Sequence, residues 1–219
     1  IELGAFGIRH ARIGGERRGL ASLSPLDLSF CAEGRVVIEI EVRPIARHLQ
    51  RQLTASQSAV LHEMFALIIA TNLAQPKVFV HRDYMQRNLM MSSPNPGVLD
   101  FQDAVVGPIA YDVVSLFRDA FVSWDDERVV GWVRLYLDRA RTAGLAVPTD
   151  FQTFWRDFEW MGLQRHLKVL GIFARIRYRD GKPHYLEDAP RFVGYVRAVV
   201  QRYAELAPLA RLFDELELP

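Results

Sequence analysis

The sequence predicts an α+β protein in which a small β-rich N-terminal part precedes a larger, mainly helical C-terminal part. Three observations predict this division. The first fifty residues combine scattered glycines with one β-rich run, residues 78–101 hold short apolar runs between polar turns, and beyond Pro108 apolar residues recur at helical spacing. We therefore expect an incomplete set of β-rich segments over 1–45 and a second domain over 46–219.

The N-terminal part is the less regular of the two. Its β-rich run covers residues 36–42 and follows the turn signal Glu33-Gly34, while five glycines interrupt residues 4–19. We expect strands here that belong to a larger sheet, with some of that sheet absent from these residues.

The C-terminal part predicts a series of helices after three short strands. Strands are expected at 78–80, 89–91 and 98–101, and helices at 56–73, 111–121 and 206–216. Ser123 with Asp126 indicates a capped helix that ends near Gly144. Thr149 is the expected cap of a long helix that reaches residue 179, and another helix is expected to start at Asp188.

Composition excludes several classes of function. Lys+Arg 27 against Asp+Glu 26 gives a formal charge of +1, too balanced to hold nucleic acid or an anionic membrane by bulk electrostatics. The apolar runs fall far short of the ~20 residues that span a bilayer, so we expect no membrane segment. Cys31 is the one cysteine, which fits a small buried side chain in a reducing compartment. We expect a monomer in the cytoplasm.

Polar residues at the ends of the predicted strands carry the chemistry. Asp83 and Asn88 follow the strand at 78–80 in the pattern HRDxxxxN, Asp100 ends the strand at 98–101 within LDF, and Asp112 begins a helix. One carboxylate can accept a proton from an attacking hydroxyl, while an amide oxygen and a second carboxylate can hold Mg²⁺ against nucleotide phosphates. The pattern therefore predicts phosphoryl transfer.

The runs HRDYMQRNLM, GVLDFQD and GPIAYD resemble the C-terminal lobe of the aminoglycoside phosphotransferase-like kinases. The resemblance implies a two-lobed protein-kinase-like fold, a nucleotide (ATP) as phosphoryl donor, and Mg²⁺. It implies Asp83 as the catalytic aspartate and Asn88 and Asp100 as the metal ligands. Three further residues would support the loop: His81 by packing and hydrogen bonding, its neighbour Arg82, and Asp112 as a brace.

A narrower resemblance covers about residues 46–219. The runs NPGVLDFQDAVVGP, GLQRHLKVLGIFARI and RDGKPHYLEDAPRF are similar to bacterial kinases of N-acetylmuramate and N-acetylglucosamine. It implies phosphorylation of the anomeric hydroxyl of an amino sugar to a 1-phosphate during peptidoglycan recycling.

Further candidate residues lie near these motifs. Arg87 is a candidate phosphate contact, and Gln102 and Asp103 are candidates for contacting the sugar. Within Gln164–Lys168 we expect one of three cationic side chains to bind the sugar's lactyl carboxylate, the alternative being an ordinary solvated helix face. These side chains are Arg165, His166 and Lys168.

Two alternatives stay open. An aminoglycoside or amino-alcohol kinase would need acidic residues to bind the amines of its cationic substrates. Glu215 and Glu217, at the end of the carboxylate-rich last helix, are consistent with this alternative. A catalytically silent kinase-like binding module is the second. The sequence also departs from the kinase pattern, because it has no lysine before Lys77, and the stretch GAFG at residues 4–7 is either a remnant of a phosphate loop or a common turn.

Overall fold

The computed structural model describes residues 28–32, 35–40, 52–119, 122–180 and 189–217, and most of these are helical. The α-helices are α2 (Ala55–Leu73), α3 (Ala110–Phe117), α4 (Asp126–Thr142), α5 (Phe151–Asp180), α6 (Ala189–Arg202) and α7 (Ala207–Glu215). Two short 3₁₀ turns, η2 (Gln86–Asn88) and η4 (Ala204–Leu206), join neighbouring elements. No helix in these described ranges is long and apolar enough to cross a membrane.

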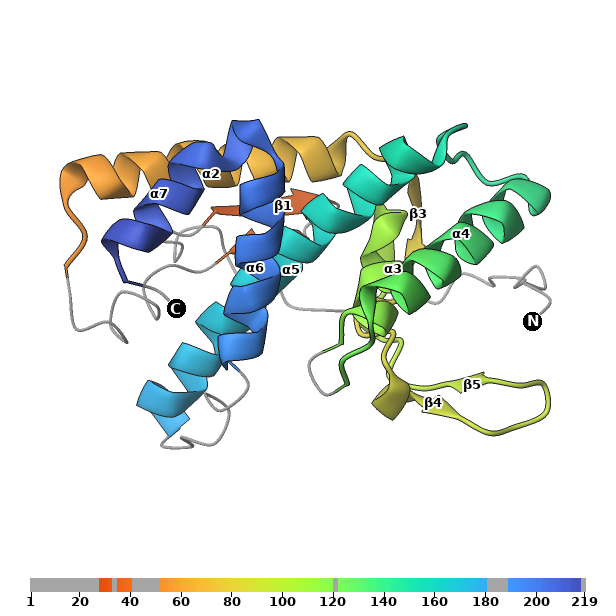
Figure 1. Cartoon of the computed structure of the whole chain (residues 1–219). Coiled ribbons are helices and arrows are strands. Elements are labelled where there is room, and N and C mark those ends of the chain that lie inside the picture. Colours follow the sequence, from red (N-terminus) through yellow and green to blue (C-terminus); the bar gives the residue numbers. More distant parts are fainter. Residues whose placement is uncertain (1–27, 33–34, 41–51, 120–121, 181–188, 218–219) are drawn as a thin grey trace.

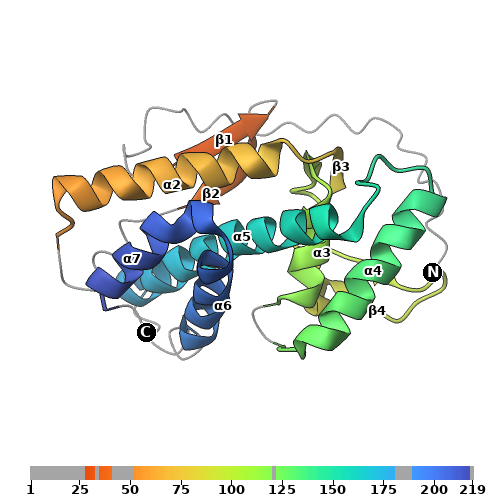
Figure 2. The same cartoon turned by 45° about the horizontal axis from the view of Figure 1, so that its top comes forward.

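Helix α5 is the centre of the packing. It contacts α2, α3, α4 and α6, and Figures 1 and 2 show it running through the middle of the molecule. Its two halves belong to two different apolar clusters. Trp160 and Leu167 pack with α2, α6 and α7, whereas Phe154 and Phe158 pack with β3, α3 and α4. Burial of these large side chains removes apolar surface from water, which is the main favourable contribution to folding.

The strands form three separate antiparallel pairs. They are β1 (Leu28–Ala32) with β2 (Arg35–Ile40), β3 (Lys77–Val80) with β6 (Val105–Pro108), and β4 (Leu89–Met90) with β5 (Gly97–Val98). The β1–β2 pair lies beside α2 and α5, and the β4–β5 hairpin projects away from the helices (Figure 1). The predicted strand at 36–42 is therefore confirmed within its described residues, 36–40.

Several predicted boundaries were wrong. Strand β6 was not predicted, because Gly107 and Pro108 look like turn residues; proline is tolerated at such an edge position. Strand β5 ends at Val98, so Asp100 lies beyond the strand and not at its last residue. Helix α3 ends at Phe117, short of the predicted residue 121.

The caps of three helices show how local sequence sets helix starts. The Thr54 hydroxyl accepts from the Gln57 backbone at 3.2 Å, and the Gln57 side chain accepts from the Thr54 backbone at 3.0 Å. Helix α4 is capped by Asp125 and not by Ser123, since the Asp125 carboxylate accepts from the Arg128 backbone at 2.8 Å. Asp150, not Thr149, accepts from the Thr153 backbone at 2.8 Å in the first turn of α5.

The expectations for residues 4–7, for the β-rich segments before residue 28, and for the start of the last domain at 46–51 lie outside the described residues. So does the expected helix start at Asp188. Helix α6 begins at Ala189, directly after it.

Candidate active site

The loop between β3 and β4, residues 81–88, is termed the HRD loop. It leaves the buried end of β3 at Val80 and turns back through η2 into β4. The Asp83 carbonyl accepts two hydrogen bonds, from the Met85 backbone at 2.9 Å and from Asn88 Nδ2 at 2.8 Å. These bonds fix the backbone of Asp83, and one of them engages the amide nitrogen of Asn88 as a donor. The Asn88 amide oxygen is consequently the atom of that side chain that is left to bind a ligand.

Asp100 lies beside Asn88 because of the β4–β5 register. Leu89 is opposite Val98, and the pairing continues one step further, where the Leu99 backbone donates to the Asn88 carbonyl at 2.9 Å. Asp100 follows directly, with φ of 65° and an exposed side chain. Positive φ is costly for a residue other than glycine, and aspartate is among the residues that tolerate it best. The hairpin thus brings together the predicted metal ligands.

Asp112 braces the HRD loop from helix α3. Its carboxylate accepts from the His81 backbone at 2.7 Å and from the Arg82 backbone at 3.0 Å. Burial raises the pKa of this carboxyl, while the two backbone hydrogen bonds oppose the rise. Arg82 has φ of 76°, so the loop adopts a left-handed turn at the point where Asp112 holds it. This geometry agrees with the predicted bracing role.

His81 links the HRD loop to the other side of the site. It is buried, and its Nε2 lies 2.8 Å from the Leu99 carbonyl. Because a carbonyl oxygen can only accept, Nε2 carries a hydrogen and donates a hydrogen bond to that carbonyl. Its ring also meets Tyr84 edge-on at 5.9 Å between centroids. The histidine thus ties the segment before Asp100 to the loop, in keeping with the packing and hydrogen-bonding role expected from the sequence.

The three cationic candidates on α5 have different surroundings. His166 is buried against the rings of Phe192 and Tyr195, so it does not face a cleft, and the expectation for it was wrong. Arg165 donates from Nη1 to the Arg82 carbonyl at 3.0 Å. Lys168 is half-buried one helical turn beyond Arg165, on the same side of α5. Because Gln164, His166 and Leu167 are buried, this part of α5 is not an ordinary solvated face either.

The other candidates lie around Asp100 and η2. Gln102 Nε2 donates to Asp100 Oδ1 at 2.5 Å, so this glutamine contacts a predicted metal ligand. Asp103 is exposed in the turn that follows. Arg87 is exposed within η2, immediately before Asn88. Of these three candidates, the structure therefore shows Gln102 in contact with a predicted metal ligand, and it shows Asp103 and Arg87 as exposed residues near Asp100 and Asn88 in the sequence.

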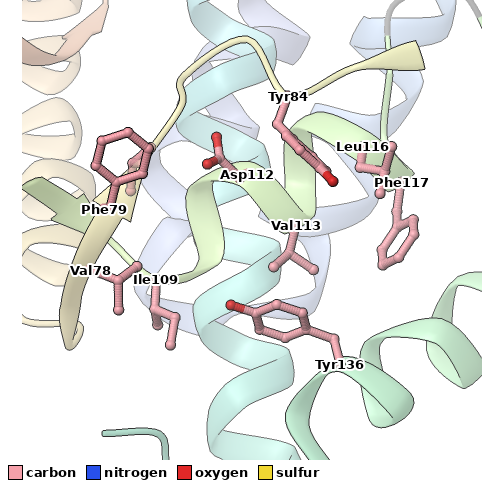
Figure 3. A pocket seen from close by; sticks show the side chains of 10 residues that line it. Val78, Phe79, Tyr84, Ile109, Asp112, Val113, Leu116, Phe117 and Tyr136 are labelled. Carbon is pink, nitrogen blue, oxygen red and sulfur yellow. The ribbon is translucent and has the colours of Figure 1, made fainter. Parts of the chain in front are cut away.

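A small cavity of about 110 Å³ lies behind the HRD loop, between β3, α3 and α4 (Figure 3). Its lining is mostly apolar, with the Asp112 carboxylate and two tyrosines as its polar members. Tyr84 reaches it from the loop and Tyr136 from α4. Burial, together with the negative charge of Asp112, raises the pKa of Tyr136 to about 12 and raises that of Tyr84 as well. Asp83 does not line this cavity, so the cavity is separate from the side chain of the predicted catalytic aspartate.

The side-chain oxygen atoms of the two predicted metal ligands suit magnesium. Asn88 and Asp100 offer an amide oxygen and a carboxylate, which are hard ligands, and Mg²⁺ commonly takes one or two protein ligands besides water and phosphate oxygens. Among the described residues, no group of three or more His, Cys, Asp or Glu side chains is placed to hold a metal. A two-donor site of this kind fits Mg²⁺ shared with a nucleotide.

Two features of the site escaped the sequence reasoning. The contact between Arg165 and Arg82 joins residues 83 positions apart, and no local pattern signals it. The cavity tyrosines also carry no motif of their own, although Tyr84 follows Asp83 directly. The cation-rich run on α5 did single out Arg165, but for a different role.

The sequence model of a family described as "Phosphotransferase enzyme family" matches residues 9–145. The chain therefore belongs to the phosphotransferase enzyme family. Membership implies a kinase-like fold, with which a mainly helical structure bearing small sheets agrees.

The chain is also similar to several proteins named N-acetylmuramate/N-acetylglucosamine kinase. It is 54% identical to that of Pseudomonas putida over 182 residues, which cover 82% of this chain and 54% of the relative. It is 55% identical to that of Neisseria meningitidis over 172 residues, 78% of this chain and 52% of the relative. The relative from Caulobacter vibrioides is 34% identical over 182 residues, 81% of this chain and 48% of the relative. The chain thus spans about half the length of the curated relatives it matches.

Proposed function

We propose that this chain carries the catalytic and sugar-binding part of a two-lobed, ATP-dependent kinase of N-acetylmuramate and N-acetylglucosamine. The observation that carries the proposal is the β4–β5 pairing, which puts Asp100 next to the HRD loop, where Asn88 is hydrogen-bonded to the Asp83 carbonyl. Two carboxylates and an amide are the side chains that supply the base and the metal ligands in phosphoryl transfer. Identity above 50% to kinases named for these two sugars supports the choice of substrate. The cytoplasmic location and the monomeric state remain predictions.

Asp83 is the proposed catalytic base. It orients the anomeric hydroxyl of the sugar and accepts its proton as the bond from that oxygen to the γ-phosphorus forms and the bond from phosphorus to the β-γ bridging oxygen breaks. A hemiacetal hydroxyl is more acidic than an ordinary alcohol, so a carboxylate suffices as acceptor. The two hydrogen bonds to the Asp83 carbonyl hold the residue in place for this step.

Asn88 and Asp100 are the proposed metal ligands. Bound Mg²⁺ would supply charge neutralisation for the phosphate oxygens. Asn88 contributes a neutral oxygen, which limits the negative charge next to a polyphosphate, and Gln102 fixes the Asp100 carboxylate through its hydrogen bond. Arg87, exposed beside Asn88, is the proposed phosphate contact.

The sugar is proposed to lie between this edge and helix α5. Asp103 is exposed after Asp100 and suits a hydroxyl or amide of the sugar. With His166 buried and Arg165 bonded to the HRD loop, Lys168 is the remaining candidate on α5 for the lactyl carboxylate of N-acetylmuramate. N-acetylglucosamine has no such carboxylate.

A panel of sugars tests the function with the whole protein. We expect Mg²⁺-ATP to yield a phosphorylated product from both amino sugars, detected by mass spectrometry, and none from 1,5-anhydro-N-acetylglucosamine, which lacks the anomeric hydroxyl. Phosphorylation of the anhydro sugar would contradict the proposed acceptor. Turnover of an aminoglycoside with neither amino sugar accepted would contradict the proposed substrate.

A further inference from the structure

Arg82 adopts a backbone conformation that needs support from outside the loop. Its φ of 76° is left-handed, a state that is unfavourable for a non-glycine residue and persists only where surrounding groups hold it. Both polar groups of its backbone are held. The N–H donates to Asp112 Oδ1 at 3.0 Å, and the carbonyl accepts from Arg165 Nη1 at 3.0 Å. Two different helices therefore fix this one residue.

The carbonyl that Arg165 holds belongs to the peptide bond between Arg82 and Asp83. A peptide bond is planar, so fixing the carbonyl oxygen also fixes the direction of the Asp83 N–H and Cα. The next carbonyl along, that of Asp83, is held by Met85 and Asn88. Arg165 thus completes a set of hydrogen bonds on both sides of the proposed base.

Arg165 is itself well placed for this task. Its guanidinium lies over the ring of Tyr111 at 5.3 Å from the centroid, and Tyr111 is buried next to Asp112 on α3. Arginine is always charged and has several fixed donors, and a hydrogen bond from a charged group is stronger than one between neutral groups. The ring holds the guanidinium beside the loop, so Arg165 on α5 rests on Tyr111, the neighbour in α3 of the other support, Asp112.

We propose that Arg165 is a positioning residue that holds the Arg82–Asp83 peptide, and thereby the Asp83 carboxylate, in its catalytic orientation. The proposal rests on the proposed function, in which Asp83 is the base. It replaces the sequence-based expectation that Arg165 binds the sugar's carboxylate. An arginine that positions the base affects every acceptor equally, whereas a carboxylate-binding arginine affects N-acetylmuramate alone.

Arg165→Met removes the guanidinium and keeps the length of the stem, and Arg165→Lys retains one charged donor. We expect Arg165→Met to lower kcat about 100-fold for both sugars, because a displaced catalytic group can cost that much, with both KM values nearly unchanged. Arg165→Lys should recover part of the loss. The matched control is Arg156→Met, which removes another half-buried α5 arginine. Arg156 stacks over Trp160 at 4.6 Å and pairs with Glu205 at 3.1 Å, and both of these partners lie outside the HRD loop.

Hydrogen exchange supplies a readout independent of turnover. Amides in peptides spanning residues 79–90 should exchange faster in Arg165→Met than in the wild type, and no faster in Arg156→Met. Equal exchange and equal kcat in the two methionine variants would overturn the proposal, as would a loss confined to the KM for N-acetylmuramate. If the wild-type protein phosphorylates neither sugar, the proposed function fails by itself, and the exchange rates still decide whether Arg165 holds the loop.

Discussion

Two neighbouring parts of the molecule are held together by different forces. The helical core, the apolar cluster that joins α2, α5, α6 and α7, is built from fully buried side chains such as Ile68, Trp160 and Leu209. The segment from 79 to 106, which includes the HRD loop, has little buried apolar surface. Of the eight large apolar side chains exposed in the described residues, six lie in this segment.

Polar contacts compensate for this in the HRD loop. Asp112 and Asn88 hold the loop by hydrogen bonds to its backbone, and the His81 ring ties the loop to the Leu99 carbonyl. Arg82 in the loop and Asp100 beyond it have positive φ values. We infer from this difference that packing of the helices supplies most of the free energy of unfolding, whereas a constrained polar loop holds the residues proposed for catalysis. Substitutions in the two parts should therefore have separable effects.

The largest expected effect is that of Asp83→Asn in the HRD loop. Removing the proposed proton acceptor should lower kcat by about 10³-fold or more, within the range known for general bases. The side chain is only partly buried and its structural bonds use the backbone carbonyl, so the melting temperature should stay that of the wild type. Coupled detection of ADP release and a thermal melt measure the two quantities. A variant that unfolds would show that Asp83 also stabilises the fold, and it would contradict the separation of stability from activity.

Phe65→Ala tests the helical core. Phe65 lies on α2 with 2% of its surface exposed, so truncation leaves a cavity and should cost about 3–5 kcal/mol of unfolding free energy, measured by urea denaturation. Well below the midpoint of unfolding, kcat per folded molecule should be unchanged. A fall in kcat as large as that of Asp83→Asn would show that the core and the loop are coupled.

The burial of His166 between α5 and α6 predicts that the free energy of unfolding depends on pH. Burial lowers its pKa to about 3, the charges of Arg165 and Arg118 act in the same direction, and a backbone contact with Arg118 opposes them in part. The unfolded value is about 6.5, so the stability contributed by the neutral ring is complete above that pH and is lost as the pH falls from 6.5 toward 3. In this pH range, His166→Gln should lower the slope of the unfolding free energy against pH by up to about 1.4 kcal/mol per pH unit.

The measurement is the free energy of unfolding of the wild type and His166→Gln between pH 4 and pH 8. Comparing the two proteins cancels groups they share, such as Asp157, whose pKa is raised by burial to about 6 and which contributes with the opposite sign. Parallel curves would mean that His166 becomes protonated without loss of structure.

The smallest expected effect is at the start of α2. Thr54→Ala removes the hydroxyl that caps the helix and should lower the unfolding free energy by about 1 kcal/mol, without change in kcat. Thr54→Ser is the matched control, because it retains the hydroxyl. Urea denaturation of both variants against the wild type measures the difference, and an equal loss in the serine variant would exclude the cap as its cause.

The sequence predicted the site residues best where chemistry imposes a short spacing. Asp83 and Asn88 are five residues apart within one loop, and Asp100 follows the next hairpin, so a local pattern could place all three together. The contact from Arg165 to Arg82 depends on how α5 packs against α3, and a pattern of neighbouring residues carries no information about that.

The helices show the same limit. The long helix α5 was predicted, but the sequence could not tell which of Arg165, His166 and Lys168 faces a cleft, and His166 is buried. Helix α5 contacts α2, α3, α4 and α6, so it is covered on several sides and a polar residue need not face water. The start of α4 was placed at Ser123 because Asp126 follows three residues later, which is the spacing of a capping box. The structure uses Asp125, and serine and aspartate are both good caps, so the local sequence does not decide between such neighbours.

The proposed transfer of a phosphoryl group from ATP to an amino sugar, with Asp83 as the base, is tested by ³¹P NMR of the whole protein with Mg²⁺-ATP and N-acetylmuramate, run beside Asp83→Asn. We predict a sugar 1-phosphate signal, split by the anomeric proton, that grows in the wild-type sample and is absent from the variant. The same signal in both samples would contradict the role of Asp83. ATP that remains intact in the wild-type sample, or that is cleaved without a phosphosugar, would contradict the proposed kinase activity.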